Sequence, residues 1–168
     1  MIRYIATGKV PEQVGNRHAS ITPFEMFKSK DGYIIICIGN EKNWKVLCNE
    51  IGHPELIEQE RFISNDNRTK NHDALYKILC DILMEKTTTE WIHILDGAGI
   101  PCGPVNNIED IINNEQIKER NMIVSVNYLD IGEVKAPGCP IKSRNYLIDP
   151  THPAPELGQD NEKILGKL

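Results

Sequence analysis

Four consecutive residues near the amino terminus offer the clearest opportunity for ligand chemistry in this chain of 168 residues. They are Gly15, Asn16, Arg17 and His18, which bring a flexible backbone, a guanidinium and an imidazole into one loop. A guanidinium beside an imidazole suits an anionic ligand, because both groups can donate hydrogen bonds to its oxygens. We take these four as candidate substrate-binding residues, and the competing interpretation is a solvated surface loop.

Other reactive residue types show no spacing typical of a catalytic or metal site. The five cysteines are Cys37, Cys48, Cys80, Cys102 and Cys139. They have neither metal-ligand spacing nor a disulfide pattern, so we expect no metal site. Cys102 would act as a nucleophile only beside a base that lowers its pKa, and the sequence places no base there. We expect His72 and His93 to be surface or core residues, and we assign no catalytic residue.

The string Gly99-Ile100-Pro101-Cys102-Gly103-Pro104-Val105 is the most informative local pattern for structure. Its two prolines restrict φ and remove two backbone donors, whereas its glycines can adopt positive φ. The string therefore cannot be regular helix, and we expect a shaped connector after a helix.

Hydrophobic patterning predicts an α+β fold, in which a β-hairpin and further strands pack with several helices. The expected hairpin has strands over 24–27 and 33–38, joined by a turn at Asp31-Gly32. The second strand is apolar on both faces, which predicts that it is covered on both sides. The expected helices are 41–51, a turn or short helix over 54–57, a longer helix that begins at Asp66 or Asn67, and a helix after a capping box at Thr87 and Glu90.

The second part of the chain has weaker patterns and many prolines. We expect helices from Asn107 through Ile112 and over 115–120, a strand over 122–128 that returns through 131–134, and a terminal helical turn over 162–168. The expected domains are a linker remnant over 1–20, a small α/β domain over 21–136 and an extended, proline-rich segment over 137–168 that packs on another part of the protein.

Composition excludes two classes of partner. The formal net charge is −5, and basic residues are interspersed with acidic ones, so we expect no nucleic-acid surface. Because no apolar run is long enough to span a bilayer and no signal peptide is apparent, we expect no membrane segment and a cytoplasmic protein.

Several motifs in a fixed order resemble the family III CoA-transferases, which include formyl-CoA and carnitine CoA-transferases and the related α-methylacyl-CoA racemases. The motifs are Gly15-Asn16-Arg17-His18, Pro23-Phe24 with Phe27, Asp31-Gly32-Tyr33, Gly39-Asn40-Glu41-Lys42-Asn43-Trp44, Arg61-Phe62 with Asn65 and Arg68, the string 99–105, Ala136-Pro137 and Ala154-Pro155-Glu156-Leu157-Gly158. The resemblance covers nearly the whole chain.

This resemblance implies the small, carboxy-terminal part of an enzyme that moves CoA between an acyl-CoA and a carboxylic acid. In the family an aspartate of the amino-terminal half attacks the thioester, and covalent carboxylate intermediates follow. Asp31, Asp66, Asp96 and Asp110 do not match that motif, so we expect them at turns or helix ends. The implied partners are the acyl-CoA, the acid, the missing amino-terminal half and a second copy in a homodimer. CoA thioester is a substrate, and no separate cofactor is implied.

Two alternatives remain open. The chain could be a non-catalytic domain for binding or subunit association, or part of an acyl-CoA racemase, a branch that uses an acidic residue near Glu41. The first turn of a helix is by itself a sufficient reason for a carboxylate at that position. The chain lacks the run of consecutive glycines of the formyl-CoA branch, which leaves the acceptor acid open. We expect the chain alone to be inactive and to bind CoA weakly.

Overall fold

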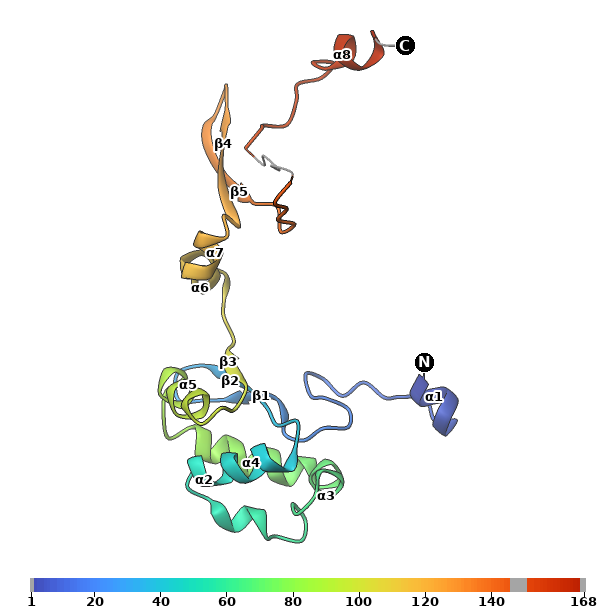
Figure 1. Ribbon diagram of the computed structural model, residues 1–168, viewed down its shortest axis with the longest axis vertical. Helices are drawn as coiled ribbons and strands as arrows, with labels where there is room; N and C mark the ends of the chain where they lie inside the picture. The colour runs from blue at the N-terminus through green and yellow to red at the C-terminus, as the bar shows by residue number, and fades with distance from the viewer. Residues whose placement is uncertain (1, 146–150, 167–168) are drawn as a thin grey trace. The chain divides into compact units, whose positions relative to one another are not determined.

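Short helices and antiparallel strands make up the chain in a computed structural model that describes residues 2–145 and 151–166 (Figure 1). The chain forms two units, residues 1–105 and 106–168. This mixture of small antiparallel sheets and helices confirms the predicted α+β class. The unit boundary lies at Val105, whereas the sequence places 21–136 in one domain, and those domain bounds remain a prediction.

A three-stranded antiparallel sheet forms one layer of the first unit. Its strands are β1 (Phe24–Lys28), β2 (Tyr33–Cys37) and β3 (Cys102–Pro104), in the order β1-β2-β3. Phe24 pairs with Cys37 and Lys28 with Tyr33, which confirms the predicted hairpin. Asp31 at its turn accepts hydrogen bonds from the backbone N–H of Thr88 at 2.8 Å and from its hydroxyl at 3.0 Å. The turn is therefore attached to the start of a distant helix.

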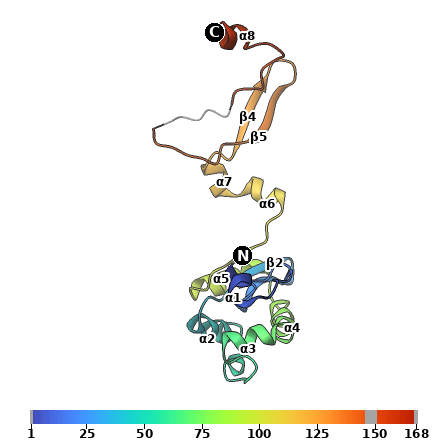
Figure 2. The ribbon, with the colours of Figure 1, turned by 90° about the vertical axis from the view of Figure 1, so that its right-hand side faces the viewer.

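Helices form the second layer and cover one face of the sheet (Figures 1 and 2). They are α2 (Glu41–Glu50), the 3₁₀ helix η1 (Pro54–Ile57), α3 (Asn65–Lys70), α4 (His72–Leu83) and α5 (Thr88–Gly97). In that unit α4 packs against β1, and α5 packs against β2 and β3. Trp44, Trp91 and Phe62 are almost wholly buried in the core. Burial of each such side chain stabilises the fold by about 1.5–3 kcal/mol.

The opposite face of the sheet is open within this unit. Tyr33 is 46% exposed and Ile35 39%, although Ile34 and Ile36 between and beyond them are fully buried. The prediction that this strand is covered on both sides is therefore wrong for the described chain. The physical reason is that the helices pack only against the side chains of alternate residues, which all point to one face of a strand.

Local signals determine where the helices begin and end, with one exception. Thr87 and Glu90 form the predicted capping box of α5. The expected longer helix from Asp66 or Asn67 is instead two helices: α3 starts after the N-cap Ser64 and ends at Lys70, and α4 follows after Asn71. The Asn71 side chain donates to the backbone oxygens of Arg61 and Asn67, at 3.2 and 2.8 Å. These contacts outside the helix ladder accompany the break between α3 and α4.

The connector at 99–105 is shaped as expected, but it also contributes a strand. Gly99 adopts φ +77° directly after α5, a conformation that favours glycine. The Cys37 N–H donates to Pro101 O at 3.0 Å, and the Val105 N–H donates to Tyr33 O at 3.1 Å. Because β3 lies at the sheet edge, its proline removes no donor that an interior strand would need.

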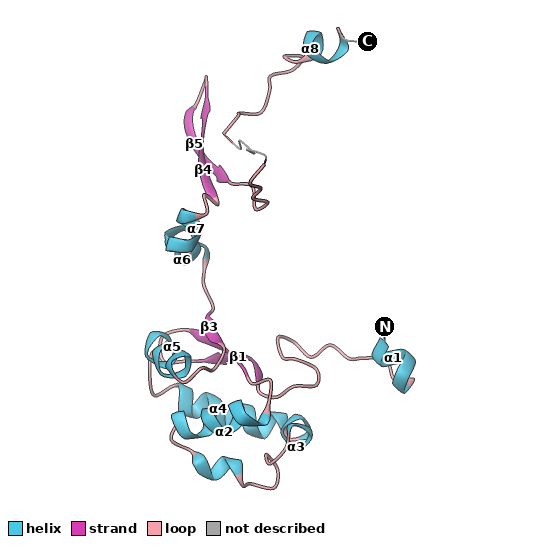
Figure 3. Cartoon of the chain, in the orientation of Figure 1, coloured by secondary structure: helices cyan, strands magenta, loops and turns pink. Residues whose placement is uncertain are grey.

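The second unit is built from short elements (Figure 3). They are α6 (Ile108–Asn113), α7 (Glu115–Glu119), β4 (Ile123–Tyr128), β5 (Gly132–Pro137) and α8 (Asn161–Leu165). The β4–β5 hairpin confirms the expected return strand, which is longer than predicted. Residues 167–168 of the expected terminal turn lie outside the described residues. In the first unit, α1 (Ile2–Thr7) is a short helix within the predicted linker remnant over 1–20.

Candidate functional site

The loop from Gly15 to His18 lies along the start of the hairpin. Gly15 adopts φ +69°, which permits the turn. The Met26 N–H donates to Asn16 Oδ1 at 2.9 Å, and the His18 N–H donates to Phe24 O at 2.9 Å. The His18 ring stacks on Phe24 with 5.3 Å between ring centroids. Asn16 and His18 therefore hold the loop against β1.

Among the four predicted site residues, Arg17 lines a hollow. Its volume is about 210 Å³, and its wall consists of Arg17 and residues Thr69, Lys70, Asn71, His72, Asp73 and Ala74. Arg17 is half-buried, whereas Lys70 is exposed. Asn71 makes no side-chain capping bond at the start of α4, and the first-turn residues His72, Asp73 and Ala74 line the hollow. Two cations and a helix amino terminus are suited to an anion, and Asp73 brings one carboxylate to the same wall.

A histidine held by two carboxylates forms one wall of this hollow. The His72 Nε2 lies 2.7 Å from Glu25 Oε1, and its Nδ1 lies 2.9 Å from Asp73 Oδ1. Glu25 is buried and His72 is only 13% exposed. The hydrogen bond from His72 holds the pKa of Asp73 below its ordinary value. The ring also stacks on Tyr76, so its orientation is restrained from three sides.

Sequence reasoning missed the role of His72. Glu25 and His72 are 47 residues apart, and only the packing of α4 on β1 brings them together. A signal existed, because Glu25 occupies an inward position in the alternation of β1, where a carboxylate needs a partner. That signal identifies Glu25 as paired but does not identify its partner.

A buried arginine braces the segment before β1. Arg68 is 1% exposed, and its Nε donates to Thr22 O at 2.8 Å. Its Nη1 donates to Phe62 O at 3.1 Å and to Glu41 Oε2 at 3.0 Å, and its Nη2 donates to Glu41 Oε1 at 2.9 Å. Its Cζ lies 4.7 Å from the centre of the Trp44 ring. The segment 20–23 is therefore attached to α2 and α3.

Glu41 is engaged by this brace. Both carboxylate oxygens accept hydrogen bonds from Arg68, and Oε1 also accepts from Asn65 N at 3.1 Å. The hydrogen bonds from Arg68 hold the pKa of Glu41 below its ordinary value. Its place in the first turn of α2 was expected, but the ion pair with Arg68 was not. Both observations explain the carboxylate at position 41 by its role in the structure.

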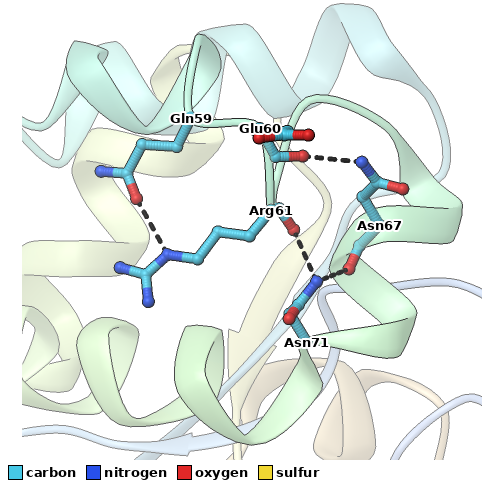
Figure 4. Close-up of a pocket in the computed structure, with 5 residues that line it drawn as sticks. All are labelled: Gln59, Glu60, Arg61, Asn67 and Asn71. Carbon is cyan, nitrogen blue, oxygen red and sulfur yellow. Dashed lines mark hydrogen bonds between the residues drawn. The ribbon is translucent and has the colours of Figure 1, made fainter.

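A second hollow also includes Asn71 in its wall (Figure 4). Its volume is about 540 Å³, and it is lined by Gln59, Glu60, Arg61, Asn67 and Asn71. Asn71 belongs to the wall of both hollows.

The remaining reactive groups have structural environments. Burial raises the pKa of Cys48 to about 12 and also raises the pKa of Cys37 and of Cys102, which disfavours thiolates. Asp110 forms a capping box with Asn107 at the start of α6. Within residues 2–145 and 151–166, no three His, Cys, Asp or Glu side chains gather as metal ligands, and no helix is long and apolar enough to cross a membrane.

Comparisons with known proteins agree on one family. The family model described as CoA-transferase family III matches residues 1–161. Succinyl-CoA:glutarate CoA-transferase of Mus musculus is 32% identical over 98% of the chain, and acetyl-CoA:oxalate CoA-transferase of Acetobacter aceti is 37% identical over 89%. A crystal structure of a CAIB/BAIF family protein from Brucella suis aligns over 99% of the chain with a TM-score of 0.80 and 28% identity. The chain spans only 38%, 37% and 43% of these proteins, respectively.

Proposed function

The chain belongs to CoA-transferase family III, and we propose that it is the carboxy-terminal part of an enzyme that transfers CoA from an acyl-CoA to a carboxylic acid. The observation that carries this proposal is the match of nearly the whole chain to curated CoA-transferases of which it spans less than two fifths. The rest of such an enzyme would supply the nucleophilic aspartate.

The environments of the aspartates in this chain support a nucleophile from elsewhere. Asp31 accepts from Thr88, Asp110 caps α6, and Asp73 is bound to His72. Asp66 lies in the first turn of α3, and Asp96 lies near the end of α5. Each has a place at a turn or helix end, and none of these five stands in an apolar cavity where it could be shielded from water.

The chemistry requires such a carboxylate, because CoA moves between two acids. An enzyme carboxylate attacks the thioester carbonyl and the C–S bond breaks. CoA leaves as a thiolate, and a mixed anhydride between the enzyme and the donor acid remains. The thiolate then attacks the enzyme carbonyl, which releases the donor acid and forms an enzyme–CoA thioester. The acceptor carboxylate repeats the two steps in the opposite order. CoA thioester is thus a substrate, and no further cofactor is needed.

We assign the substrate anion to the loop Gly15–His18 and its hollow. Arg17 would bind a carboxylate or phosphate oxygen there, while Asn16 and His18 hold the loop on β1. The names of two relatives contain glutarate and oxalate, which are acids with two carboxylates. We therefore propose a dicarboxylic acid as the acceptor, since its second carboxylate needs a cation such as Arg17.

The open apolar surface supports contact with the remainder of the enzyme. Tyr33 and Ile35 are exposed on one sheet face, and Ile108 and Ile112 are 75% and 48% exposed on α6. Exposed apolar surface of this kind is typical of interfaces. We propose that the rest of the enzyme and a second copy in a homodimer cover such surfaces, with the tail 137–168 among the docking segments. Five free thiols support a reducing compartment, the cytoplasm.

The test is a CoA-exchange assay with the full-length enzyme, several acyl-CoA donors and a panel of mono- and dicarboxylic acids. We expect transfer to a dicarboxylic acid, and Arg17→Gln should raise its KM about tenfold, because a charge-assisted hydrogen bond is lost. Arg120→Gln, which changes an exposed arginine outside both hollows, is the matched control. If CoA is transferred to none of these acids, the transferase proposal is refuted, and a non-catalytic domain for binding or subunit association remains.

A second measurement on the same full-length enzyme distinguishes a racemase from a transferase. A racemase would exchange the α-proton of a branched acyl-CoA with solvent deuterium and would not need an acceptor acid. We expect no such exchange, because the Glu41 carboxylate accepts hydrogen bonds from Arg68 and Asn65 and is therefore not available to remove a proton from a substrate.

A further inference from the structure

The hollow shown in Figure 4 is built from a turn that is attached to two helices. The turn after η1 contributes Gln59, Glu60 and Arg61. Asn67 of α3 donates through Nδ2 to Glu60 O at 2.6 Å, and Asn71 donates through Nδ2 to Arg61 O at 3.2 Å. The backbone of the turn is therefore held in place. The volume of about 540 Å³ is large enough for a small organic acid.

The guanidinium of Arg61 is oriented by its neighbours. Its Nε donates to Gln59 Oε1 at 3.1 Å, which restrains one edge. Its Cζ lies 4.6 Å from the centre of the Phe62 ring, and Phe62 itself is fully buried. One face of the guanidinium thus rests on a fixed ring. Such restraint lowers the entropy that is lost when a ligand binds.

The outer edge of this guanidinium has its donors available. Within the part of the chain that the structure describes, Nη1 and Nη2 of Arg61 take part in no hydrogen bond or ion pair. The two groups form a planar fork that matches the two oxygens of a carboxylate. In contrast, the guanidinium of Arg68 uses four of its five N–H donors on Thr22, Phe62 and Glu41. Of these two arginines, Arg61 is therefore the one whose Nη1 and Nη2 can donate hydrogen bonds to a ligand.

The charge of the wall selects among anions. Arg61 is the cation and Glu60 the anion among the five lining residues, and the other three are amides. One guanidinium beside one carboxylate suits the single charge that one carboxylate group of an organic acid brings, whereas a phosphate dianion places two charges at one centre. The amide nitrogens of both asparagines are used by backbone oxygens, so their Oδ1 atoms remain to accept from a hydroxyl.

We propose that this hollow is a carboxylate-binding site, in which Nη1 and Nη2 of Arg61 bind the carboxylate of a small organic acid. The site is separate from the assignment of Arg17, which faces a different hollow. The same carboxylate could belong to a substrate acid or to a free acid that acts as an effector, and its recognition by Arg61 is the same in both cases.

Direct binding tests the proposal without reliance on catalysis. Glutarate and inorganic phosphate are titrated into full-length, ¹⁵N-labelled protein while the Arg61 Nε–H and Asn71 side-chain amide signals are followed. We expect saturable shifts with glutarate, weaker binding of phosphate, and about tenfold weaker glutarate binding in Arg61→Gln. Arg61→Lys should lose part of the affinity because it keeps the charge but not the fork. Arg120→Gln is the matched control.

Equal glutarate affinity in wild type and Arg61→Gln would overturn the proposal, as would shifts that rise linearly without saturation. Because Arg61 is exposed, the substitution should not unfold the protein, and the unchanged dispersion of the Trp44 and Trp91 indole signals verifies this. A shift of those indole signals in the variant would direct the test to Gln59→Met, which removes only the acceptor that orients Arg61. A glutarate affinity unchanged in that variant as well would also overturn the proposal.

Steady-state kinetics distinguish the two sources of the carboxylate. For a substrate acid, Arg61→Gln raises the KM of that acid and leaves the KM of the acyl-CoA unchanged. For an effector, added glutarate changes kcat of the wild type with another acid as acceptor, and the variant loses this response. A protein that binds glutarate through Arg61 and yet transfers no CoA would refute the proposed function while it confirms this site.

Discussion

The ion pair between Arg68 and Glu41 gives the sharpest test of how the first unit is held together. Arg68 is 1% exposed and donates four hydrogen bonds, two to backbone oxygens and two to the Glu41 carboxylate. Arg68→Met would leave Thr22 O and Phe62 O without this donor and Glu41 without its cation. We expect a loss of about 2–5 kcal/mol in the free energy of unfolding, because the backbone oxygens of two buried residues lose a charged donor and each unpaired group costs about 1–3 kcal/mol.

Glu41→Gln should cost less, because the Glu41 side chain is 51% exposed. Water screens that end of the pair, so we expect about 1–2 kcal/mol rather than the full value for a buried carboxylate. The double variant should lose less than the sum of the two single changes, by about 1–2 kcal/mol. Urea unfolding followed by tryptophan fluorescence measures all four proteins, since both tryptophans lie in this core.

The pH dependence provides an independent check on the same pair. Arg68 lowers the pKa of Glu41 from its ordinary value of 4.5, so the folded state binds a proton less readily than the unfolded state. The stabilisation by this carboxylate is therefore present above pH 4.5 and is lost as the pH falls through the lower pKa of the folded state. The difference in stability between wild type and Glu41→Gln should shrink in that range. Additive single variants, or a difference that stays constant on acidification, would refute the reasoning.

Three other outcomes follow from local contacts. Asp31→Ala should lower the urea midpoint slightly, because the Thr88 N–H loses its acceptor, whereas Asp31→Asn, which keeps an acceptor oxygen, should lower it less. Thr87→Ala should cost about 1 kcal/mol through loss of the capping box with Glu90, and Thr87→Ser, which keeps the hydroxyl, should cost much less. Cys48, with a pKa of about 12, should resist alkylation at pH 8, where roughly one thiol in ten thousand is ionised; peptide mapping by mass spectrometry that finds rapid modification of folded protein would contradict this.

Elements with strong short-range signals could be predicted from the sequence. The hairpin turn at Asp31-Gly32, the capping box at Thr87 and the helix stop at Gly99 each depend on residues that lie within a few positions of one another. The break at Asn71 could not be predicted in this way. It involves a bond from Asn71 to Arg61, ten residues away in a neighbouring turn.

The candidate site shows the same division. The residue types in the loop 15–18 suggested anion binding, but residue type does not reveal where each side chain points. The structure separates Arg17, which lines a hollow, from Asn16 and His18, which bind β1. Arg61 was part of a recognised motif, yet its available fork becomes visible only through the positions of its neighbours.

The order of residue types alone determined the α+β class, the hairpin and the family of this chain, because these depend on local backbone preferences and on motifs that are contiguous. Tertiary structure decided which charged groups meet. Glu41 reaches Arg68 across 27 positions and Glu25 reaches His72 across 47. Such pairs depend on how helices pack on the sheet, and packing is determined by the shape and burial of the entire core rather than by any short stretch of chain.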